Sequence, residues 1–299
     1  MDPNYLVAKP VEFGRESRPG LLLKNVYALY GSQFRRWFGI TAPTSVLAAF
    51  VLLMADQRIR TIFGRIPRGE IQYHWDEISE TFVLRFSSFF IAWLLGCFAL
   101  AAIATVVNDL DIDDSSETWR RDSFQRAREH FGALLSAALC TFCAFLVGTA
   151  ILGFVESSLI RVVGWEHFAS FNLVASVISY VVVATIVSWF GMAIPLILSG
   201  DIGVWKALKR SVRISNGYEG FLLLLVLESL AGSYVAWYAI HYGLVLLFPA
   251  HLTYTAWYGW LVYFVTILAS AAVQPPMFIG FSLLANNEHS LDSRLLPNA

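Results

Sequence analysis

The stretch DIGVWKALKRSVRISNGYEGF, residues 201–221, places four cationic side chains between two long apolar segments. On a helical wheel these four cations fall within about 100° of one another, and apolar residues occupy the other side. The cations are Lys206, Lys209, Arg210 and Arg213. The pattern predicts an amphipathic helix lying in the membrane interface, where it would contact anionic lipid headgroups. The alternative is an ordinary basic loop between two spans.

Long uncharged runs on either side of this stretch indicate a membrane protein. The chain has 299 residues, of which 57% are hydrophobic and only 14% are charged. Residues 37–55, 86–108, 131–155 and 168–200 contain no Asp, Glu, Lys, Arg or His. Even the shortest run would extend about 28 Å as a helix, so each run can cross a bilayer.

The C-terminal third adds two further spans, because the polar residues 248–256 divide an apolar region. We therefore predict an all-α integral membrane protein with six transmembrane helices between a segment 1–36 and a tail 288–299. The predicted spans are 37–55, 86–108, 131–155, 171–199, 220–247 and 257–285. The first apolar run follows a polar lead, so no cleaved signal peptide is expected.

The distribution of Lys and Arg predicts the orientation. Fifteen of the 21 Lys and Arg residues lie in 1–36, 109–130, 201–219 and the tail. Such residues are retained on the cytoplasmic side during insertion, so both termini are expected to be cytoplasmic. The net charge of −1 gives no indication of a nucleic-acid partner.

The tryptophans are expected to mark the same interfaces. Trp37, Trp119 and Trp205 fall at the predicted inner interface, and Trp165 and Trp257 at the outer one. Aromatic belts at both membrane surfaces are typical of membrane proteins.

The basic stretch has two earlier counterparts, WRRDSFQRAREHF from Trp119 and KNVYALYGSQFRRWF at 24–38. Each runs directly into a predicted span, and the period is about ninety residues. The chain is therefore predicted to contain three tandem units of cytoplasmic interfacial helix, span, outer loop and span. The basic residues of the second copy are Arg120, Arg121, Arg126 and Arg128.

Residues that cap or interrupt helices support these units. Asn216-Gly217 predicts a stop before the fifth span. Pro195 and Pro275-Pro276 lie inside the fourth and sixth spans, where proline removes a backbone donor and kinks a helix. The carbonyl groups that such kinks release in lipid must find partners in neighbouring helices or water.

Two segments carry a family resemblance: WFGMAIPLILSGDIGVWKALKRSVRISNGYEGF and ATVVNDLDIDDSSETWRRDSFQRAREHFGALL. Together they resemble the glycerophosphoryl diester phosphodiesterase membrane-domain family of prokaryotic membrane proteins, over about residues 80–299. The matching positions are Ala193, Pro195, Asp201, Ala207, Leu208, Arg210, Ser211 and Gly217. The resemblance implies a six-helix membrane module. It implies no phosphodiesterase activity in these residues, because in fused family members that chemistry belongs to a separate soluble barrel.

Glu228 is the first candidate for a functional site, because it lies about 12 Å into the fifth span. A central charge costs about 3 kcal/mol on insertion scales, so its carboxyl group is expected to point into the bundle. One reading is a proton- or ligand-coupled group near Gln274 and the broken sixth span. The other is a protonated acid that makes an interhelical hydrogen bond.

The remaining candidates have simpler readings. Cys140 and Cys143 form C-x-x-C inside a span and are expected to be small packing residues. The run DLDIDD at 109–114 begins like a calcium loop but lacks its glycine and its final glutamate, so no metal is expected. His241 is the one histidine inside a predicted span, and a packed or hydrogen-bonded imidazole is expected rather than a haem or pigment ligand.

No catalytic residues, cofactor or phosphate-binding loop are found in this sequence. We therefore predict a non-enzymatic membrane module that acts through lipids and through helix contacts with membrane-protein partners or with its own copies. The alternative is a small transporter or permease component with Glu228 in a mid-membrane site.

Overall fold

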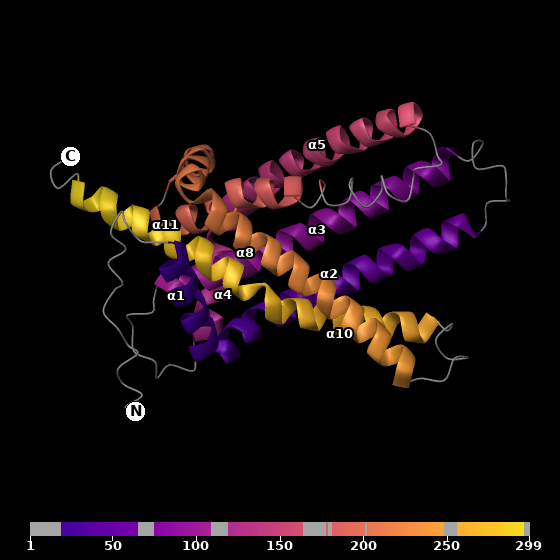
Figure 1. The fold of residues 1–299 in the computed structure, drawn as a ribbon, viewed down its shortest axis with the longest axis horizontal. Helices are drawn as coiled ribbons and strands as arrows, with labels where there is room; N and C mark the ends of the chain where they lie inside the picture. Colours follow the sequence, from indigo (N-terminus) through magenta and orange to yellow (C-terminus); the bar gives the residue numbers. More distant parts are fainter. Residues whose placement is uncertain are drawn as a thin grey trace.

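The computed structural model describes residues 19–64, 75–108, 119–163, 178, 181–200, 202–247 and 256–295, and every regular element among them is a helix. Residues 181–190, which precede α7, are also helical. Helices are the expected element for these apolar runs, because a helix satisfies its backbone groups internally. The labelled helices in chain order (Figure 1) are α1 (Pro19–Ser32), α2 (Phe34–Phe63), α3 (Trp75–Asn108), α4 (Trp119–Glu129), α5 (Phe131–Val163), α7 (Ala193–Gly200), α8 (Val204–Leu247), α10 (Ala256–Val273) and α11 (Pro275–Leu295).

Six helical segments of the described chain are long and apolar enough to cross a membrane, which confirms the prediction of an all-helical, multi-pass protein. The segments are Phe34–Phe63, Trp75–Asn108, Phe131–Phe154, Val181–Ser199, Val204–Leu247 and Trp260–Asn286.

The first two spans are longer than predicted. The sequence places their ends at residues 55 and 86, beside the first charged residues, but α2 and α3 continue for 30 and 34 residues in total. At 1.5 Å per residue these helices are about 45 and 51 Å long, well beyond a hydrocarbon core of about 30 Å.

Ion pairs accompany this extension of the α2–α3 hairpin. Arg58 bonds to Glu80 across the two helices at 3.0 Å. Asp56 Oδ2 accepts a hydrogen bond from Arg60 Nε at 2.8 Å, and Asp56 Oδ1 lies 3.7 Å from Arg85 Nη1 of α3. The charged residues at the ends of the apolar runs therefore lie inside α2 and α3, and both helices extend past them.

The helices converge at one end of the molecule and diverge toward the other (Figure 1). We call the first the near end, where α1, α4 and α11 gather, and the second the far end. One buried core joins residues of eight labelled helices of the described chain at the near end, namely α1, α2, α3, α4, α5, α7, α8 and α11. Its residues include Ile103 of α3, Leu134 of α5, Leu196 of α7, Leu222 of α8 and Ile279 of α11.

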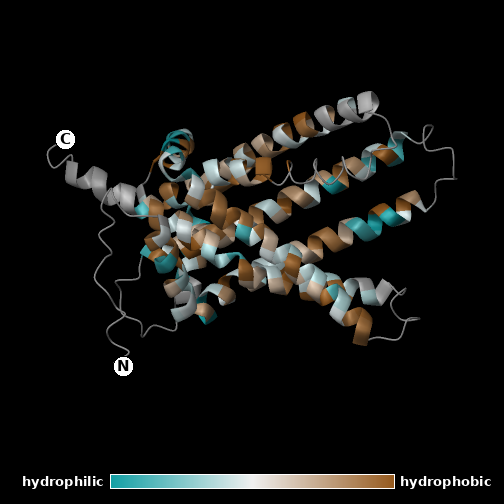
Figure 2. Cartoon of the chain, viewed as in Figure 1, coloured by the Kyte–Doolittle hydropathy of each residue, from teal (hydrophilic) through white to brown (hydrophobic). Residues whose placement is uncertain are grey.

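The far halves of the spans expose large apolar side chains instead. Phe82 of α3, Phe154 of α5 and Leu246 of α8 are 67%, 73% and 86% exposed. Brown, hydrophobic residues recur along these helices (Figure 2). An apolar surface of this kind suits contact with lipid tails or with other membrane helices.

Trp37 corrects the expectation that it anchors the chain in the interface. Its side chain is fully buried, and its Nε1 donates to the Leu29 carbonyl oxygen at 3.1 Å. Trp37 therefore joins α1 to the start of α2. Trp205, by contrast, is 67% exposed.

Glycine permits the closest approach of two helices at the near end. A Cβ on Gly191 would overlap the ring of Phe281 in α11, and a Cβ on Gly280 would overlap Leu225 of α8. Small residues at such contacts let membrane helices pack closely.

The Gly191→Ala substitution is expected to lower the stability of the detergent-solubilised protein by about 1–3 kcal/mol, because the Phe281 ring must move. Thermal unfolding followed by circular dichroism measures this change. Gly96→Ala is the matched control, because a Cβ there meets nothing within 4 Å. Equal stability of the two variants would contradict the close approach.

Candidate functional site

Both predicted helix breaks are present. Gln274 separates α10 from α11, and Pro275 is the first residue of α11. The fourth span is interrupted at Gly191 and Met192, a few residues before Pro195. Pro195 thus lies in the first turn of α7, where proline is tolerated because that turn has no intrahelical donors to lose.

The prolines of the sixth span leave two carbonyl oxygens without a donor from their own helix. Hydroxyl groups from other helices donate hydrogen bonds to both. In an unbroken helix the carbonyls of Ala271 and Ala272 would accept from the residues that are prolines here. Instead, Thr41 Oγ1 of α2 donates to Ala271 at 2.7 Å. Tyr30 Oη of α1 donates to Ala272 at 2.5 Å.

The break in the fourth span is satisfied in the same way. Ser211 Oγ donates to the Trp189 carbonyl at 2.6 Å, and Ser215 Oγ donates to the Ser188 carbonyl at 2.8 Å. Both serines belong to the first part of α8. The backbone oxygens at the two breaks therefore bind groups of the protein itself.

One face of the first part of α8 therefore packs against other helices of the protein. Ala207, Ser211 and Ser215 are fully buried and recur every four residues. This spacing of small residues is typical of helix–helix contacts in membranes. This spacing is the sequence signal that could have identified the helix–helix contact. The amphipathic pattern alone did not predict that contact.

The opposite face of this segment carries the predicted cations. Lys206, Lys209 and Arg213 are exposed, whereas Arg210 is partly buried. Lys209 Nζ lies 5.4 Å from the centre of the Trp205 ring. The segment ends in a kink at Tyr218, with φ of −132°, next to the stop predicted at Asn216-Gly217.

The second basic copy forms the separate helix α4. Arg126 and Arg128 are exposed on it. The side chains of Arg120 and Arg121 lie outside the described residues, as does the run 109–114.

Glu228 does not point into the bundle as expected. Its side chain is exposed on α8, and the Tyr27 hydroxyl of α1 lies beside its carboxylate. Burial and the neighbouring Glu228 raise the pKa of the Tyr27 hydroxyl above its ordinary value. Tyr27 therefore stays protonated at neutral pH and can donate a hydrogen bond to Glu228. This contribution to stability is present in full below the ordinary tyrosine pKa and is lost as pH rises from there through the raised pKa.

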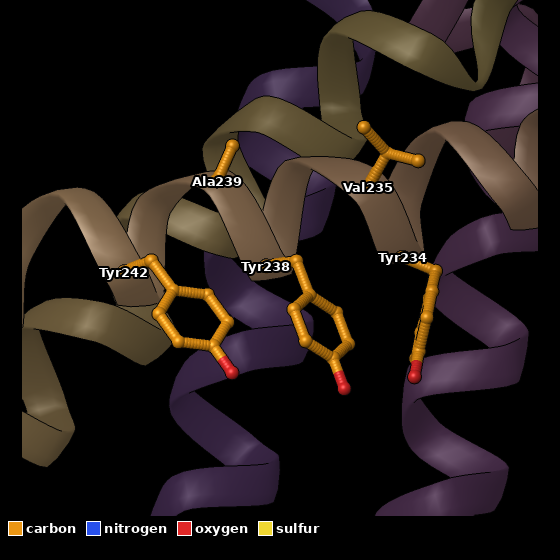
Figure 3. A pocket seen from close by; sticks show the side chains of 5 residues that line it. All are labelled: Tyr234, Val235, Tyr238, Ala239 and Tyr242. Carbon is orange, nitrogen blue, oxygen red and sulfur yellow. The ribbon is translucent and has the colours of Figure 1, made fainter.

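His241 lies in an aromatic group on the far half of α8. Its ring stacks on Trp237 with centroids 5.5 Å apart and planes 4° apart, and its carbonyl accepts from Tyr258 Oη at 3.2 Å. This agrees with a packed imidazole. Tyr234, Tyr238 and Tyr242 form an adjacent row of rings that project from one face of α8 (Figure 3).

The cysteine pair corrects another expectation, since Cys140 and Cys143 are exposed rather than packed. Cys97 is buried in the core. Among the described residues no three His, Cys, Asp or Glu side chains lie close enough to hold a metal ion.

Thr41→Val is expected to destabilise the protein by about 1 kcal/mol, because the Ala271 carbonyl loses its partner. Thr44→Val is the matched control, because Thr44 Oγ1 donates only to carbonyls of its own helix. Denaturant-induced unfolding in micelles measures both variants, and equal losses would contradict the assignment.

A double-mutant cycle tests the second hydroxyl. Tyr30→Phe is expected to cost more in the natural sequence than in a Pro276→Ala background, where a restored N–H can bond to the Ala272 carbonyl. Additive effects would show that Tyr30 does not act through that carbonyl.

Comparison with family models, with curated proteins and with solved structures finds no match to this chain, so the family resemblance stays a prediction.

Proposed function

We propose that this protein is a non-enzymatic membrane module that binds anionic lipid through its near-end basic helices and offers its far span halves to membrane-protein partners or further copies of itself. The proposal places it in a prokaryotic inner membrane with both termini in the cytoplasm. Its lipid contacts would involve the exposed Lys206, Lys209 and Arg213.

One observation carries the proposal: four backbone oxygens at the two helix breaks accept hydrogen bonds from hydroxyl groups of neighbouring helices. In many transporters the unwound backbone of a broken span coordinates the transported ion or substrate near the bilayer midplane. Here the corresponding oxygens accept hydrogen bonds from side-chain hydroxyl groups, those of Tyr30, Thr41, Ser211 and Ser215. The breaks thus support a structural role more than a transport role.

The placement of Glu228 gives the transporter alternative little support. Its side chain is exposed beside Tyr27, and it lines neither the pocket at Tyr234, Tyr238 and Tyr242 nor the groove between α2 and α10. A coupling residue is expected to face a water-filled or substrate-filled cavity between helices.

The triple substitution of Lys206, Lys209 and Arg213 by Gln tests the lipid contact. The natural protein is expected to melt at a higher temperature in nanodiscs of anionic phosphatidylglycerol than in zwitterionic phosphatidylcholine, since each cation contributes about 1 kcal/mol near an anionic surface. The triple variant is expected to lose most of this difference and to melt normally in phosphatidylcholine.

A difference between the two lipids that survives in the triple variant would contradict the lipid role of this helix. Native mass spectrometry of the purified protein tests the partner role: a stoichiometric protein or a second copy supports it. A bound small solute whose retention depends on Glu228, measured with Glu228→Gln, would instead favour the transporter.

A further inference from the structure

A groove lies between α2 and α10. Four residues of α2 and three of α10 line it, and all seven are apolar. They include Ala49, Phe50 and Leu53 of α2 and Trp260 and Phe264 of α10. Its volume is about 560 Å³, within the range of roughly 300–1,000 Å³ that is typical of small-molecule sites.

The lining of the groove continues along α2 into charged residues. On a helical wheel, Ala49 and Phe50 bound an arc of about 100° that contains Leu53 and also Arg60. Arg60 lies about 10 Å beyond Leu53 along the helix axis, in the direction of the far end. The apolar groove therefore leads to a guanidinium group on the same face.

The charge at this end of the groove is positive. Asp56 accepts from Arg60 Nε at 2.8 Å and lies 3.7 Å from Arg85 Nη1, so two cations share one carboxylate. The Arg60 side chain is 81% exposed. Its Nε–H donates a hydrogen bond to Asp56 Oδ2. Teal, hydrophilic residues mark this end of α2 and α3 (Figure 2).

Among the described residues, the other acids at this end of α2 and α3 are Glu80, Asp76 and Glu77. Glu80 is bonded to Arg58, a neutral pair on another side of α2. Asp76 and Glu77 lie in the first turn of α3, about 12 Å farther along that helix than Arg85. The cluster of Asp56, Arg60 and Arg85 by itself carries one net positive charge, and its carboxylate lies closer to Arg60 than to Arg85.

We propose that this groove binds one phospholipid of the far leaflet, with an acyl chain between α2 and α10 and its phosphate on Arg60. Bidentate hydrogen bonding suits a guanidinium and a phosphate, and Arg85 supplies a second positive charge nearby. Trp260, near the start of α10, lies where tryptophan favours the headgroup region.

Charge complementarity favours a phospholipid over a helix of another protein. An apolar helix would fill the groove without using the cation, whereas a phospholipid combines an acyl chain with an anion. The site lies at the opposite end from the basic helix of α8, so it is independent of the near-end lipid contact.

Native mass spectrometry of the delipidated full-length protein, titrated with palmitoyl-oleoyl phosphatidylglycerol, tests the proposal. One lipid is expected to bind more tightly than the others. Arg60→Gln is expected to weaken that event by about tenfold, and Arg60→Lys by less. Leu53→Trp is expected to abolish it by filling the groove, and a diacylglycerol with the same chains is expected to bind poorly.

Two matched controls lie on the same helix. Arg58→Gln removes a guanidinium outside the groove, and Leu47→Trp enlarges a residue that is 55% exposed and does not line it. Both are expected to keep the tight lipid. Circular dichroism and size-exclusion chromatography verify that each variant is folded.

Equal weakening by Arg58→Gln and Arg60→Gln would overturn the proposal, as would unchanged binding in folded Leu53→Trp. Tight binding of diacylglycerol would overturn the role of Arg60. A complex with a second copy or with another protein that fills the groove and holds no lipid would also overturn the proposal.

Discussion

A backbone carbonyl in lipid has no water to bond to, so each broken span in this bundle depends on a hydroxyl group from another helix. Tyr30 and Thr41 supply that group for the sixth span, and Ser211 and Ser215 supply it for the fourth. Because these donors lie on α1, α2 and α8, the breaks draw several helices together. The near end is the packed end of the molecule for this reason.

The two ends therefore meet their surroundings differently. At the near end, the first part of α8 binds protein through small residues and exposes cations on its other face. At the far end, the spans separate and expose aromatic and aliphatic side chains, with ion pairs continuing α2 and α3 beyond the apolar runs. Lipid contact at the near end is proposed to be electrostatic and spread over several cations. At the far end it is proposed to involve one groove and one guanidinium group.

The positions of the spans and of their breaks could be predicted from the sequence, because both have local causes. An uncharged run longer than a bilayer and a proline within it are recognisable without knowledge of the neighbours. The kink next to Asn216-Gly217 belongs to the same class. Orientation, tandem units and location in the interface remain predictions.

The contacts of the site residues could not be predicted from the periodicity of the sequence. Thr41 and Tyr30 have no unusual local sequence, and their partners lie more than two hundred residues away. Glu228 was expected to face inward because of the cost of a charge in lipid, but its side chain is exposed beside Tyr27 of α1, a neighbour that the local sequence does not indicate. The small residues from Ala207 to Ser215 did carry a signal, which the stronger basic pattern on the same helix obscured.

The bond between Tyr30 and Ala272 spans 242 positions of the chain, which has a consequence for biosynthesis. Helix α1 is made before α10 and cannot form this contact until α10 has entered the membrane. Earlier intermediates therefore hold α1 without that partner, and the contact closes late in the assembly of these helices. Contacts of such long range slow folding, and in a cell they leave time for quality control to act on a half-inserted chain.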